Sequence, residues 1–352
     1  MTIAVFDKRT VASLASGDPY VQKARAICLD WLNGKESYML PTSGSTGPPK
    51  QIEVRADQLK ASVYATSEAL SLYQGTRVLA CLNIDYVAGF MMLIRAMELD
   101  WEVTLLAPSS NPLLLLPEES EFDFTALVPM QLYEIISNPE TSHRAKKLGK
   151  ILLGGVGLSR SQEEAFKKLD QEVYLGYGMT ETVSHVALQR VGEASAGRFY
   201  LTGDVEFGTD PRGCLFFNGA VTGYQPVQTN DLATVFREER AFQLHGRIDH
   251  VVNSGGIKIQ LEEMESQIGE LLAANGVFSD FFLWKIPDER LGNALVLVVE
   301  GAPELEEKIS GILRKGLDRL KRPRKLYFTG SFFRTGSDKT DKYRTFEGLT
   351  GA

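Results

Sequence analysis

Small and hydroxyl-bearing residues are concentrated in the stretch Pro41–Lys50, which reads Pro-Thr-Ser-Gly-Ser-Thr-Gly-Pro-Pro-Lys. Glycines let a backbone approach a ligand closely, and successive N–H groups in such a loop form a nest for an anion. The hydroxyl groups and the Lys50 ammonium would complete a phosphate-binding loop. The alternative is a surface turn, because the same residue types dominate turns. A Walker A loop is excluded, because Pro49 and Gln51 stand where Gly and Ser or Thr are required.

Further polar segments follow along the chain, and each is a weak signal when it is taken alone. They are Tyr177-Gly178-Met179-Thr180-Glu181, Thr229-Asn230-Asp231-Leu232, Gly246-Arg247-Ile248-Asp249, Ser254-Gly255-Gly256-Ile257-Lys258-Ile259 and Arg334-Thr335-Gly336-Ser337-Asp338-Lys339.

Together, and in this order, the segments resemble the core motifs of acyl-adenylate-forming enzymes, which include acyl-CoA synthetases, adenylation domains and luciferases. The resemblance runs from Leu40 almost to the C-terminus. It implies an ATP-dependent ligase that first forms an acyl-adenylate and then a thioester. ATP, Mg²⁺, coenzyme A and a small carboxylic acid are the ligands that it implies.

The resemblance assigns an ATP-binding role to residues of several segments. The β- and γ-phosphates would lie on the loop, backbone would line an adenine slot, Tyr177 would stack on the adenine, and Asp231 would accept from the ribose with help from Arg247. The ATP-binding residues so implied are Thr42, Ser43, Gly44, Ser45, Thr46, Gly47, Lys50, Gly154, Gly155, Val156, Tyr177, Asp231 and Arg247.

The same resemblance implies the catalytic residues. Thr180 would bond the α-phosphate, and Glu181 would hold Mg²⁺, a hard cation that prefers oxygen ligands. Lys339 would bridge the carboxylate and the α-phosphate. Asp249 would be a hinge about which the C-terminal domain turns, after which Gly255 and Gly256 would admit the thiol.

Each of these residues also has an ordinary structural interpretation. Glu181 could be a carboxylate at a helix N-terminus, Asp231 a turn residue and Lys339 part of a solvated basic tail. The sequence also departs from the family pattern, because Gln51, Asn230 and Asp338 replace glycines.

The acid-binding residues implied by the resemblance are Tyr86, Gly89, Arg95, Ser184 and His185. A basic residue at position 95 and the run Tyr177–Leu188 are similar to the compact bacterial o-succinylbenzoate–CoA ligases of menaquinone synthesis. An Arg on an apolar helix needs a partner, which a second substrate carboxylate would supply. A salt bridge to Asp85 or Glu98 is the alternative, and His185 could equally be a packed core histidine.

Three other functions remain open from the sequence. One is a different acyl- or aryl-CoA synthetase. The second is a stand-alone adenylation domain that loads a carrier protein. The third is a non-enzymatic binder of acyl-adenylates, which retention of Glu181, Asp231 and Lys339 disfavours.

Short apolar strands alternate with helical segments between residues 78 and 175, which predicts βαβ units and an α/β fold. Ligands bind beyond the carboxyl ends of such strands. We predict a large N-terminal adenylation domain over residues 1–248, with βαβ layers, a reduced first subdomain and a small β-rich subdomain. A small, mobile α+β C-terminal domain over residues 249–352 would carry the catalytic lysine.

Composition limits the classes of partner. The chain has 352 residues, a net charge of −7 and three widely spaced cysteines. The acidic balance disfavours nucleic acid, and the cysteine usage suggests a reducing compartment. We see no signal peptide and no run long enough to span a membrane, so we expect a cytoplasmic enzyme. A homodimer is left open.

Overall fold

The structure is a computed structural model that describes residues 2–42, 50–155, 157–192, 197–334 and 340–350. It divides into two compact units. The first unit comprises Met1–Gly208, Phe216–Gln228 and Val235–Gln243, and the second comprises Thr209–Leu215, Thr229–Thr234 and Leu244–Ala352. No helix of the described residues is both long and apolar enough to cross a membrane.

Parallel strands form the centre of the first unit. The parallel pairs run through β5 (Glu102–Leu105), β4 (Arg77–Ala80), β6 (Phe124–Leu127), β7 (Lys150–Leu153) and β8 (Val173–Met179). A short strand, β1 (Ala4–Phe6), pairs antiparallel with β5 at the edge. Helices connect the parallel strands, so the predicted α/β fold with βαβ units is confirmed.

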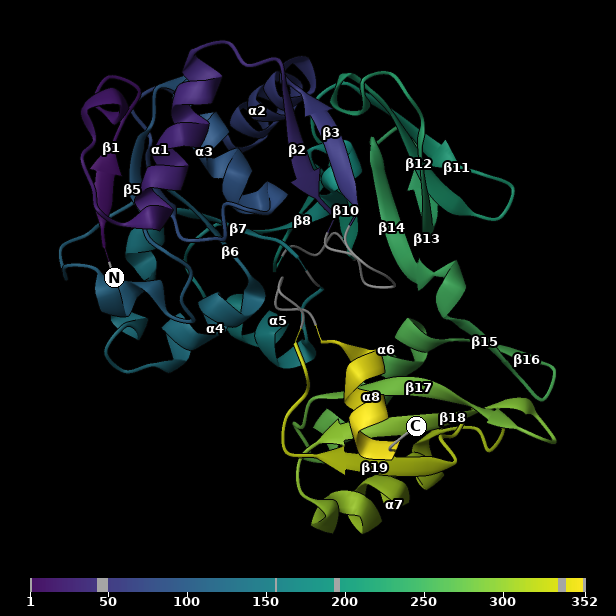
Figure 1. The fold of residues 1–352 in the computed structure, drawn as a ribbon. Helices are drawn as coiled ribbons and strands as arrows, with labels where there is room; N and C mark the ends of the chain where they lie inside the picture. The colour runs from purple at the N-terminus through teal and green to yellow at the C-terminus, as the bar shows by residue number, and fades with distance from the viewer. Residues whose placement is uncertain (1, 43–49, 156, 193–196, 335–339, 351–352) are drawn as a thin grey trace. The chain divides into compact units, whose positions relative to one another are not determined.

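Helices cover both faces of this sheet. Successive strand residues such as Val78 and Leu79, or Leu152 and Leu153, belong to two different apolar clusters, because neighbouring side chains point to opposite faces. One cluster contains α1 (Pro19–Leu32), α2 (Ala56–Leu70) and α3 (Val87–Leu99), which pack together, and the other contains α4 (Pro129–Ser137) and α5 (Arg160–Phe166) (Figure 1).

Antiparallel strands continue the sheet beyond β8. In sequence order they are β9 (Ser184–Arg190), β10 (Arg198–Leu201), β11 (Val205–Thr209), β12 (Cys214–Gly219), β13 (Val227–Phe236) and β14 (Ala241–Arg247). The hydrogen-bonded order of the twelve-stranded sheet is β1-β5-β4-β6-β7-β8-β9-β10-β14-β13-β12-β11. The β-rich character predicted for residues 200–242 is therefore observed.

Short elements complete the first unit. A separate hairpin joins β2 (Ser37–Pro41) to β3 (Gln51–Arg55). Among the described residues of both units, the 3₁₀ helices are η1 (Val11–Ser13), η2 (Pro112–Leu115), η3 (Ser142–Leu148), η4 (Thr180–Thr182), η5 (Ala220–Thr222), η6 (Ile248–His250) and η7 (Pro303–Leu305).

The second unit has its own core. A hairpin of β15 (Val251–Ser254) and β16 (Ile257–Gln260) leads into α6 (Leu261–Ala274). A three-stranded sheet follows, in which β18 (Gly292–Glu300) pairs antiparallel with β17 (Phe281–Asp288) and parallel with β19 (Lys325–Thr329). Apolar side chains of α6 and of α7 (Glu306–Gly316) pack with this sheet, and α8 (Lys342–Thr350) ends the described chain.

Local boundaries differ from the sequence-based expectations in three places. Asp57 has a residue type that often caps helices and is expected from the sequence to begin a helix, but Arg55 is the N-cap of α2, and the Gln58 side chain accepts from the Arg55 N–H at 3.0 Å. The sequence also predicts one helix from Pro303 to Leu320, whereas α7 ends at Gly316. Part of the predicted polar tail forms α8, because Phe346 packs against Phe282 and its neighbours.

Candidate active site

The stretch 41–50 closes the hairpin of β2 and β3. Pro41 pairs with Gln51, the Thr42 N–H donates to the Lys50 carbonyl at 2.8 Å, and the Lys50 N–H donates to Thr42 Oγ1 at 3.1 Å. These bonds hold the two ends of the loop together, and Lys50 is exposed. Ser43, Gly44, Ser45, Thr46 and Gly47 lie outside the described residues, so their phosphate-binding role stays a prediction.

The structure places the second motif against the base of this loop. Tyr177 and Gly178 lie in β8, whereas Thr180 and Glu181 lie in η4, directly after the strand. Thr180 is buried, and its hydroxyl donates to the Pro41 carbonyl at 3.4 Å. Two motifs that are 139 residues apart in the sequence therefore meet in space.

Gly178 permits a sharp irregularity between β8 and β9. The register shifts between Tyr177 and Gly178, so that Tyr177 faces Ala187 and Gly178 faces His185. A Cβ atom at Gly178 would lie 2.0 Å from the Ser184 carbonyl oxygen. Only glycine fits here, because the backbone of Ser184 and His185 in β9 comes this close to the end of β8.

The aromatic ring of Tyr177 lies in an aromatic cluster. Its centroid is 5.1 Å from that of Phe242, 5.8 Å from that of Phe217 and 5.9 Å from that of Phe199. These contacts fix the ring in an apolar environment that suits a planar base. Stacking on adenine stays a prediction.

The glycines after β7 keep their backbone accessible. The Gly154 N–H donates to the Leu127 carbonyl at 3.1 Å, and no atom lies within 4 Å of a Cβ built on Gly154. Gly155 is exposed and has a φ of +97°, which favours glycine. An open backbone edge at the carboxyl end of a parallel strand is suited to a nucleotide, and Val156 lies outside the described residues.

Arg95 is the most unusual residue of the first unit. It lies in the middle of α3 with only 1% of its surface exposed, and burial lowers its pKa to about 9. Its Nη2 donates to Ser184 Oγ at 3.3 Å, whereas Nε has no hydrogen-bond partner among the described residues.

The alternative partners that the sequence left open for Arg95 are engaged with other groups. Asp85 forms an ion pair with Lys23. Glu98 accepts from Trp31 Nε1 at 3.2 Å and from the Tyr64 hydroxyl at 2.8 Å. Among the described residues, no ion pair joins Arg95 to a carboxylate, so its positive charge is buried without a counter-ion.

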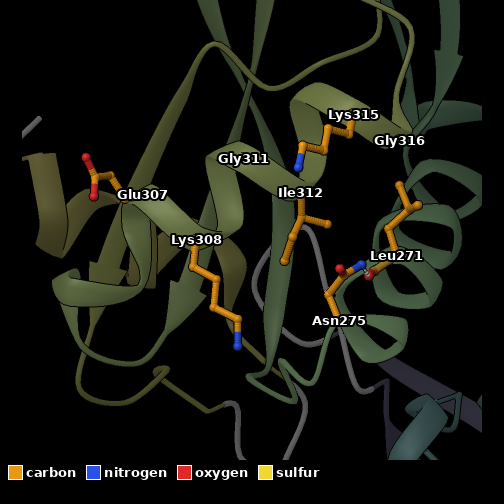
Figure 2. Close-up of a pocket in the computed structure, with 8 residues that line it drawn as sticks. All are labelled: Leu271, Asn275, Glu307, Lys308, Gly311, Ile312, Lys315 and Gly316. Carbon is orange, nitrogen blue, oxygen red and sulfur yellow. Dashed lines mark hydrogen bonds between the residues drawn. The ribbon is translucent and has the colours of Figure 1, made fainter.

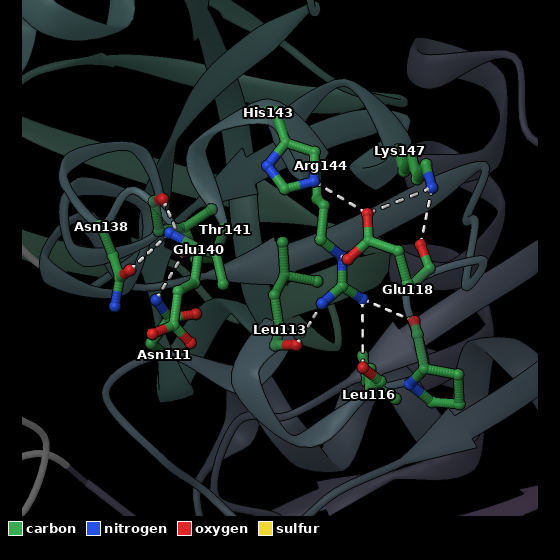
Figure 3. Close-up of polar contacts among 12 residues, drawn as sticks. Asn111, Leu113, Leu116, Glu118, Asn138, Glu140, Thr141, His143, Arg144 and Lys147 are labelled. Atoms are coloured by element: carbon green, nitrogen blue, oxygen red, sulfur yellow. Dashed lines mark hydrogen bonds and ion pairs between the residues drawn. The ribbon is translucent and has the colours of Figure 1, made fainter.

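A second buried arginine shows how this chain satisfies a structural guanidinium. Arg144 donates to the carbonyl oxygens of Leu113 at 2.7 Å, Leu116 at 3.3 Å and Pro117 at 2.6 Å (Figure 3). Its Nε lies 3.4 Å from Glu118 Oε2. Arg144 thus has carbonyl partners and a carboxylate, and Arg95 has one hydroxyl.

His185 connects Ser184 to helix α2. Its Nδ1 lies 3.4 Å from Ser184 Oγ, and its Nε2 lies 3.2 Å from Thr66 Oγ1. Burial and the charge of Arg95 lower the pKa of His185 to about 3, so the imidazole is neutral at physiological pH. The sequence interpretation missed Thr66; the only signal was the pair of hydroxyl residues, Ser62 and Thr66, one turn apart on an apolar helix face.

Tyr86 and Gly89 begin α3. Tyr86 is its N-cap residue and is half-buried, and a Cβ at Gly89 would lie 2.4 Å from the Asn83 carbonyl oxygen. Gly89 therefore allows the helix to pack on the preceding loop. A contact of either residue with the acid stays a prediction.

In the second unit, Arg247 joins two of the predicted residues. Its Nε and Nη2 donate to the two carboxylate oxygens of Asp249 at 2.9 and 2.8 Å, and its Nη1 lies 3.5 Å from Asp231 Oδ1. Burial alone would raise the pKa of Asp249, but the bonds from Arg247 keep it below its usual value. The predicted ribose-binding pair is thus formed within this unit, next to the predicted hinge.

Gly255 and Gly256 form the turn between β15 and β16. Their φ angles are +60° and +85°, which a two-residue hairpin turn requires. Lys339 lies outside the described residues, but the residues on either side of its segment pair: Arg334 bridges Thr340, and Arg334 Nη1 donates to Thr340 Oγ1 at 3.0 Å.

Two observations concern ligands. A hollow of about 350 Å³ lies between α6 and α7 and contains none of the predicted site residues; Leu271, Asn275 and Lys315 are among its lining residues (Figure 2).

Among the described residues, no group of three or more His, Cys, Asp or Glu side chains could hold a metal. The single carboxylate of Glu181 still fits Mg²⁺, because this ion is usually held by one or two carboxylates together with substrate phosphates.

Two curated relatives carry the same enzyme name. A 2-succinylbenzoate–CoA ligase of Lactococcus lactis subsp. lactis is 22% identical over 343 residues, covering 89% of this chain and 71% of that protein. A 2-succinylbenzoate–CoA ligase of Staphylococcus aureus is 31% identical over 144 residues, which cover 41% of this chain and only 29% of that protein.

Two solved structures share the fold of this chain. An acyl-CoA synthetase (AMP-forming)/AMP-acid ligase II-like protein from Dyadobacter fermentans is 43% identical, with a TM-score of 0.69, and the match covers 99% of this chain and all of that one. The o-succinylbenzoate coenzyme A synthetase of Bacillus subtilis in complex with ATP and magnesium has a TM-score of 0.69 at 20% identity, over 88% of this chain and 69% of that one.

A family model described as AMP-binding enzyme matches residues 30–206, which is half of the chain. That range contains the hairpin loop, the glycines after β7, the Tyr177–Glu181 motif and Arg95. The chain belongs to the AMP-binding enzyme family, whose members include AMP-forming acid–CoA ligases.

Proposed function

We propose that this protein is an AMP-forming acid–CoA ligase whose acid carries a second carboxylate, most specifically 2-succinylbenzoate, and that it serves menaquinone biosynthesis. The observation that supports this substrate is the buried Arg95, which has no carboxylate partner among the described residues. The names of the two curated relatives point to the same acid.

The energetic argument for a second carboxylate is direct. A buried charge whose partner is missing costs about 3–5 kcal/mol, so an unpaired guanidinium is kept only where a ligand completes it. A carboxylate matches the guanidinium fork and supplies the missing negative charge. Arg95 lies beside Ser184, only three residues after Glu181, so such a carboxylate would bind next to the reacting centre.

In the first step, a carboxylate oxygen of the acid attacks the α-phosphorus of ATP. An acyl–O–P bond forms, the bond from the α-phosphorus to the bridging oxygen breaks, and pyrophosphate leaves with the electron pair. The Thr180 hydroxyl and Lys339 stabilise the charge that grows on the α-phosphate, and the 41–50 loop holds the departing phosphates. The Glu181 carboxylate would hold Mg²⁺, which would supply positive charge to the phosphates.

Other residues orient the nucleotide in this proposal. The backbone of Gly154, Gly155 and Val156 lines the adenine slot, and Tyr177 stacks on the base. Asp231 accepts from the ribose hydroxyls, and its pairing with Arg247 positions the carboxylate.

In the second step, the sulfur of coenzyme A attacks the acyl carbon. A C–S bond forms, the C–O bond to AMP breaks, and the thiol proton passes to solvent. The second unit turns about Asp249, so that Lys339 leaves and the Gly255–Gly256 turn admits the thiol.

ATP–pyrophosphate exchange over a panel of acids tests the proposal. We expect exchange with 2-succinylbenzoate to exceed exchange with its two single-carboxylate analogues, 4-oxo-4-phenylbutanoate and 2-butanoylbenzoate, by at least about tenfold in kcat/KM, the worth of one charged hydrogen bond. Addition of coenzyme A should then yield the thioester.

Each contrary result removes a defined part of the proposal. Absence of exchange with every acid rules out the enzyme. Exchange confined to simple fatty acids rules out the dicarboxylate. Exchange without thioester formation from free coenzyme A favours a domain that loads a carrier protein.

A further inference from the structure

A chain of buried hydrogen bonds leads from Arg95 to helix α2. Arg95 Nη2 meets Ser184 Oγ at 3.3 Å, Ser184 Oγ meets His185 Nδ1 at 3.4 Å, and His185 Nε2 meets Thr66 Oγ1 at 3.2 Å. Thr66 Oγ1 finally meets the Ser62 carbonyl at 2.8 Å. Arg95, His185 and Thr66 are each less than a tenth exposed.

The direction of every hydrogen bond in this chain follows from its last member, the Ser62 carbonyl. A carbonyl only accepts, so the single proton of the Thr66 hydroxyl goes to Ser62. Thr66 Oγ1 must then accept from His185, which places the imidazole proton on Nε2. A neutral imidazole has one N–H, so Nδ1 accepts the Ser184 proton. Ser184 Oγ is left as an acceptor, and the Arg95 N–H is the donor that fits it.

Helix α2 also holds the strained turn that carries Ser184. Val183 and Ser184 have φ angles of +53° and +92°, which are rare for residues with a side chain, and rarest for a β-branched one. The Ser62 hydroxyl donates to the Val183 carbonyl at 2.8 Å. Ser62 and Thr66 are one turn apart on α2, so one helix face fixes both the backbone before Ser184 and the side chain after it.

We propose that Thr66, acting through His185 and Ser184, is a positioning residue that sets the guanidinium of Arg95 for the second carboxylate of the acid. The inference rests on the proposed function. Thr66 touches neither substrate nor reacting atoms. Through His185 it directs the single hydroxyl proton of Ser184 toward His185 Nδ1, so that Ser184 Oγ accepts from Arg95 Nη2 and Arg95 Nε is left for the ligand.

In this proposal, the preference for an acid with a second carboxylate depends on a chain of neutral hydrogen-bonding groups. A carboxylate in place of Ser184, which contacts Arg95 directly, would pair with the guanidinium and satisfy its charge. A neutral acceptor chain orients the guanidinium and leaves its charge for the substrate. This explains why a histidine is kept neutral beside an arginine.

Thr66→Val removes the hydroxyl and keeps the shape of the side chain. We expect the KM for 2-succinylbenzoate in ATP–pyrophosphate exchange to rise between about three- and tenfold, the worth of one hydrogen bond. The KM for ATP and the KM for 4-oxo-4-phenylbutanoate should stay within about twofold, since neither ligand uses the second-carboxylate site. Thr66→Ser keeps the hydroxyl and should restore the selectivity between the two acids.

Thr125→Val is the matched control. Thr125 is a fully buried threonine of the same unit whose hydroxyl donates to the Leu148 carbonyl at 2.8 Å, with no connection to Arg95. It should lower the melting temperature as Thr66→Val does, and leave the selectivity unchanged. Equal selectivity in Thr66→Val and Thr125→Val would overturn the inference.

A double-mutant cycle distinguishes an effect of Thr66 on the position of Arg95 from a general loss of packing in the first unit. If Thr66 acts through Ser184, the pair Thr66→Val and Ser184→Ala should have no larger effect on the diacid KM than Ser184→Ala alone. Additive losses would contradict the chain. The wild-type protein tests the proposed function by itself, and if it does not activate the diacid, both the proposed function and the role of Thr66 are overturned. If the wild type prefers the diacid but Thr66→Val leaves that preference unchanged, only the role of Thr66 is overturned.

Discussion

Arg95 and Arg144 are both buried arginines, but their surroundings differ. Arg144 is surrounded by the carbonyl oxygens of Leu113, Leu116 and Pro117, so its positive charge stabilises the end of η2 (Figure 3). Among the described residues, Arg95 has a single hydroxyl partner in an apolar helix. In the proposed function, the free energy that Arg95 costs the fold is tolerated because its guanidinium binds a carboxylate of the acid.

This contrast makes a stability prediction. Arg95→Met removes an unpaired buried charge, so we expect the free energy of unfolding to stay within about 1 kcal/mol of wild type or to rise. Arg144→Met leaves three carbonyl oxygens without a donor and should lower it by about 3 kcal/mol. Urea denaturation of the two variants checks both values.

The same two variants should separate in activity. Arg95→Met should lose the preference for the diacid over its single-carboxylate analogues, because the guanidinium that pairs with the second carboxylate is gone. A clear drop in stability for Arg95→Met, as large as that of Arg144→Met, would show that Arg95 is a structural residue.

The element that organises the first unit's part of the site is the junction of β8, η4 and β9. It places Thr180 against the base of the 41–50 hairpin and turns the chain so that Ser184 and His185 face α2 and α3. Gly178 and the left-handed turn at Val183 and Ser184 make this possible. Their backbone conformations are costly, and contacts from α2 maintain them.

Gly178→Ala should therefore be poorly tolerated and should destabilise the fold. A methyl group would lie 2.0 Å from the Ser184 carbonyl oxygen, so β9 must move, and we expect a loss of about 1–3 kcal/mol in the free energy of unfolding. Gly154→Ala is the control, because no atom lies near its Cβ position; its change should stay within about 0.5 kcal/mol. Equal melting temperatures of the two variants would refute the role given to Gly178.

At the scale of the whole molecule, the predicted site residues are distributed over both compact units. Asp231 and Arg247 lie in the second unit together with Asp249, whereas Thr180 and Glu181 lie in the first. The proposed mechanism uses residues of both units in the first step and exchanges Lys339 for the Gly255–Gly256 turn in the second. Such an exchange requires the units to move as separate bodies.

Lys339→Ala tests this sequence of events. We expect acyl-adenylate formation to fall at least about hundredfold, because a cation at the transferring phosphoryl group is lost. Thioester formation from supplied acyl-adenylate should be largely retained. Lys342→Ala is the control, since Lys342 forms an ion pair with Glu265 at 2.8 Å, and it should leave both partial reactions almost unchanged. Equal loss of the two partial reactions in Lys339→Ala would contradict the hinge mechanism.

Local patterns in the sequence were enough for the family and the α/β fold, and they brought forward the site residues that stay predictions. The motifs are short and ordered, and the periods of apolar residues predict strands and helices, because both depend on neighbours along the chain. Boundaries that depend on distant packing were wrong, as at α8, where Phe346 joins the cluster of Phe282.

Only the tertiary structure showed which groups surround Arg95. The sequence left Asp85 and Glu98 as partners, and the fold engages both with other groups. The residues of the hydrogen-bond chain that reaches Arg95 are remote in sequence: Ser184 is 89 residues away, and Thr66 is 119 residues from His185. Whether a buried charge is paired depends on every group around it in space, and no local pattern of residues carries that information.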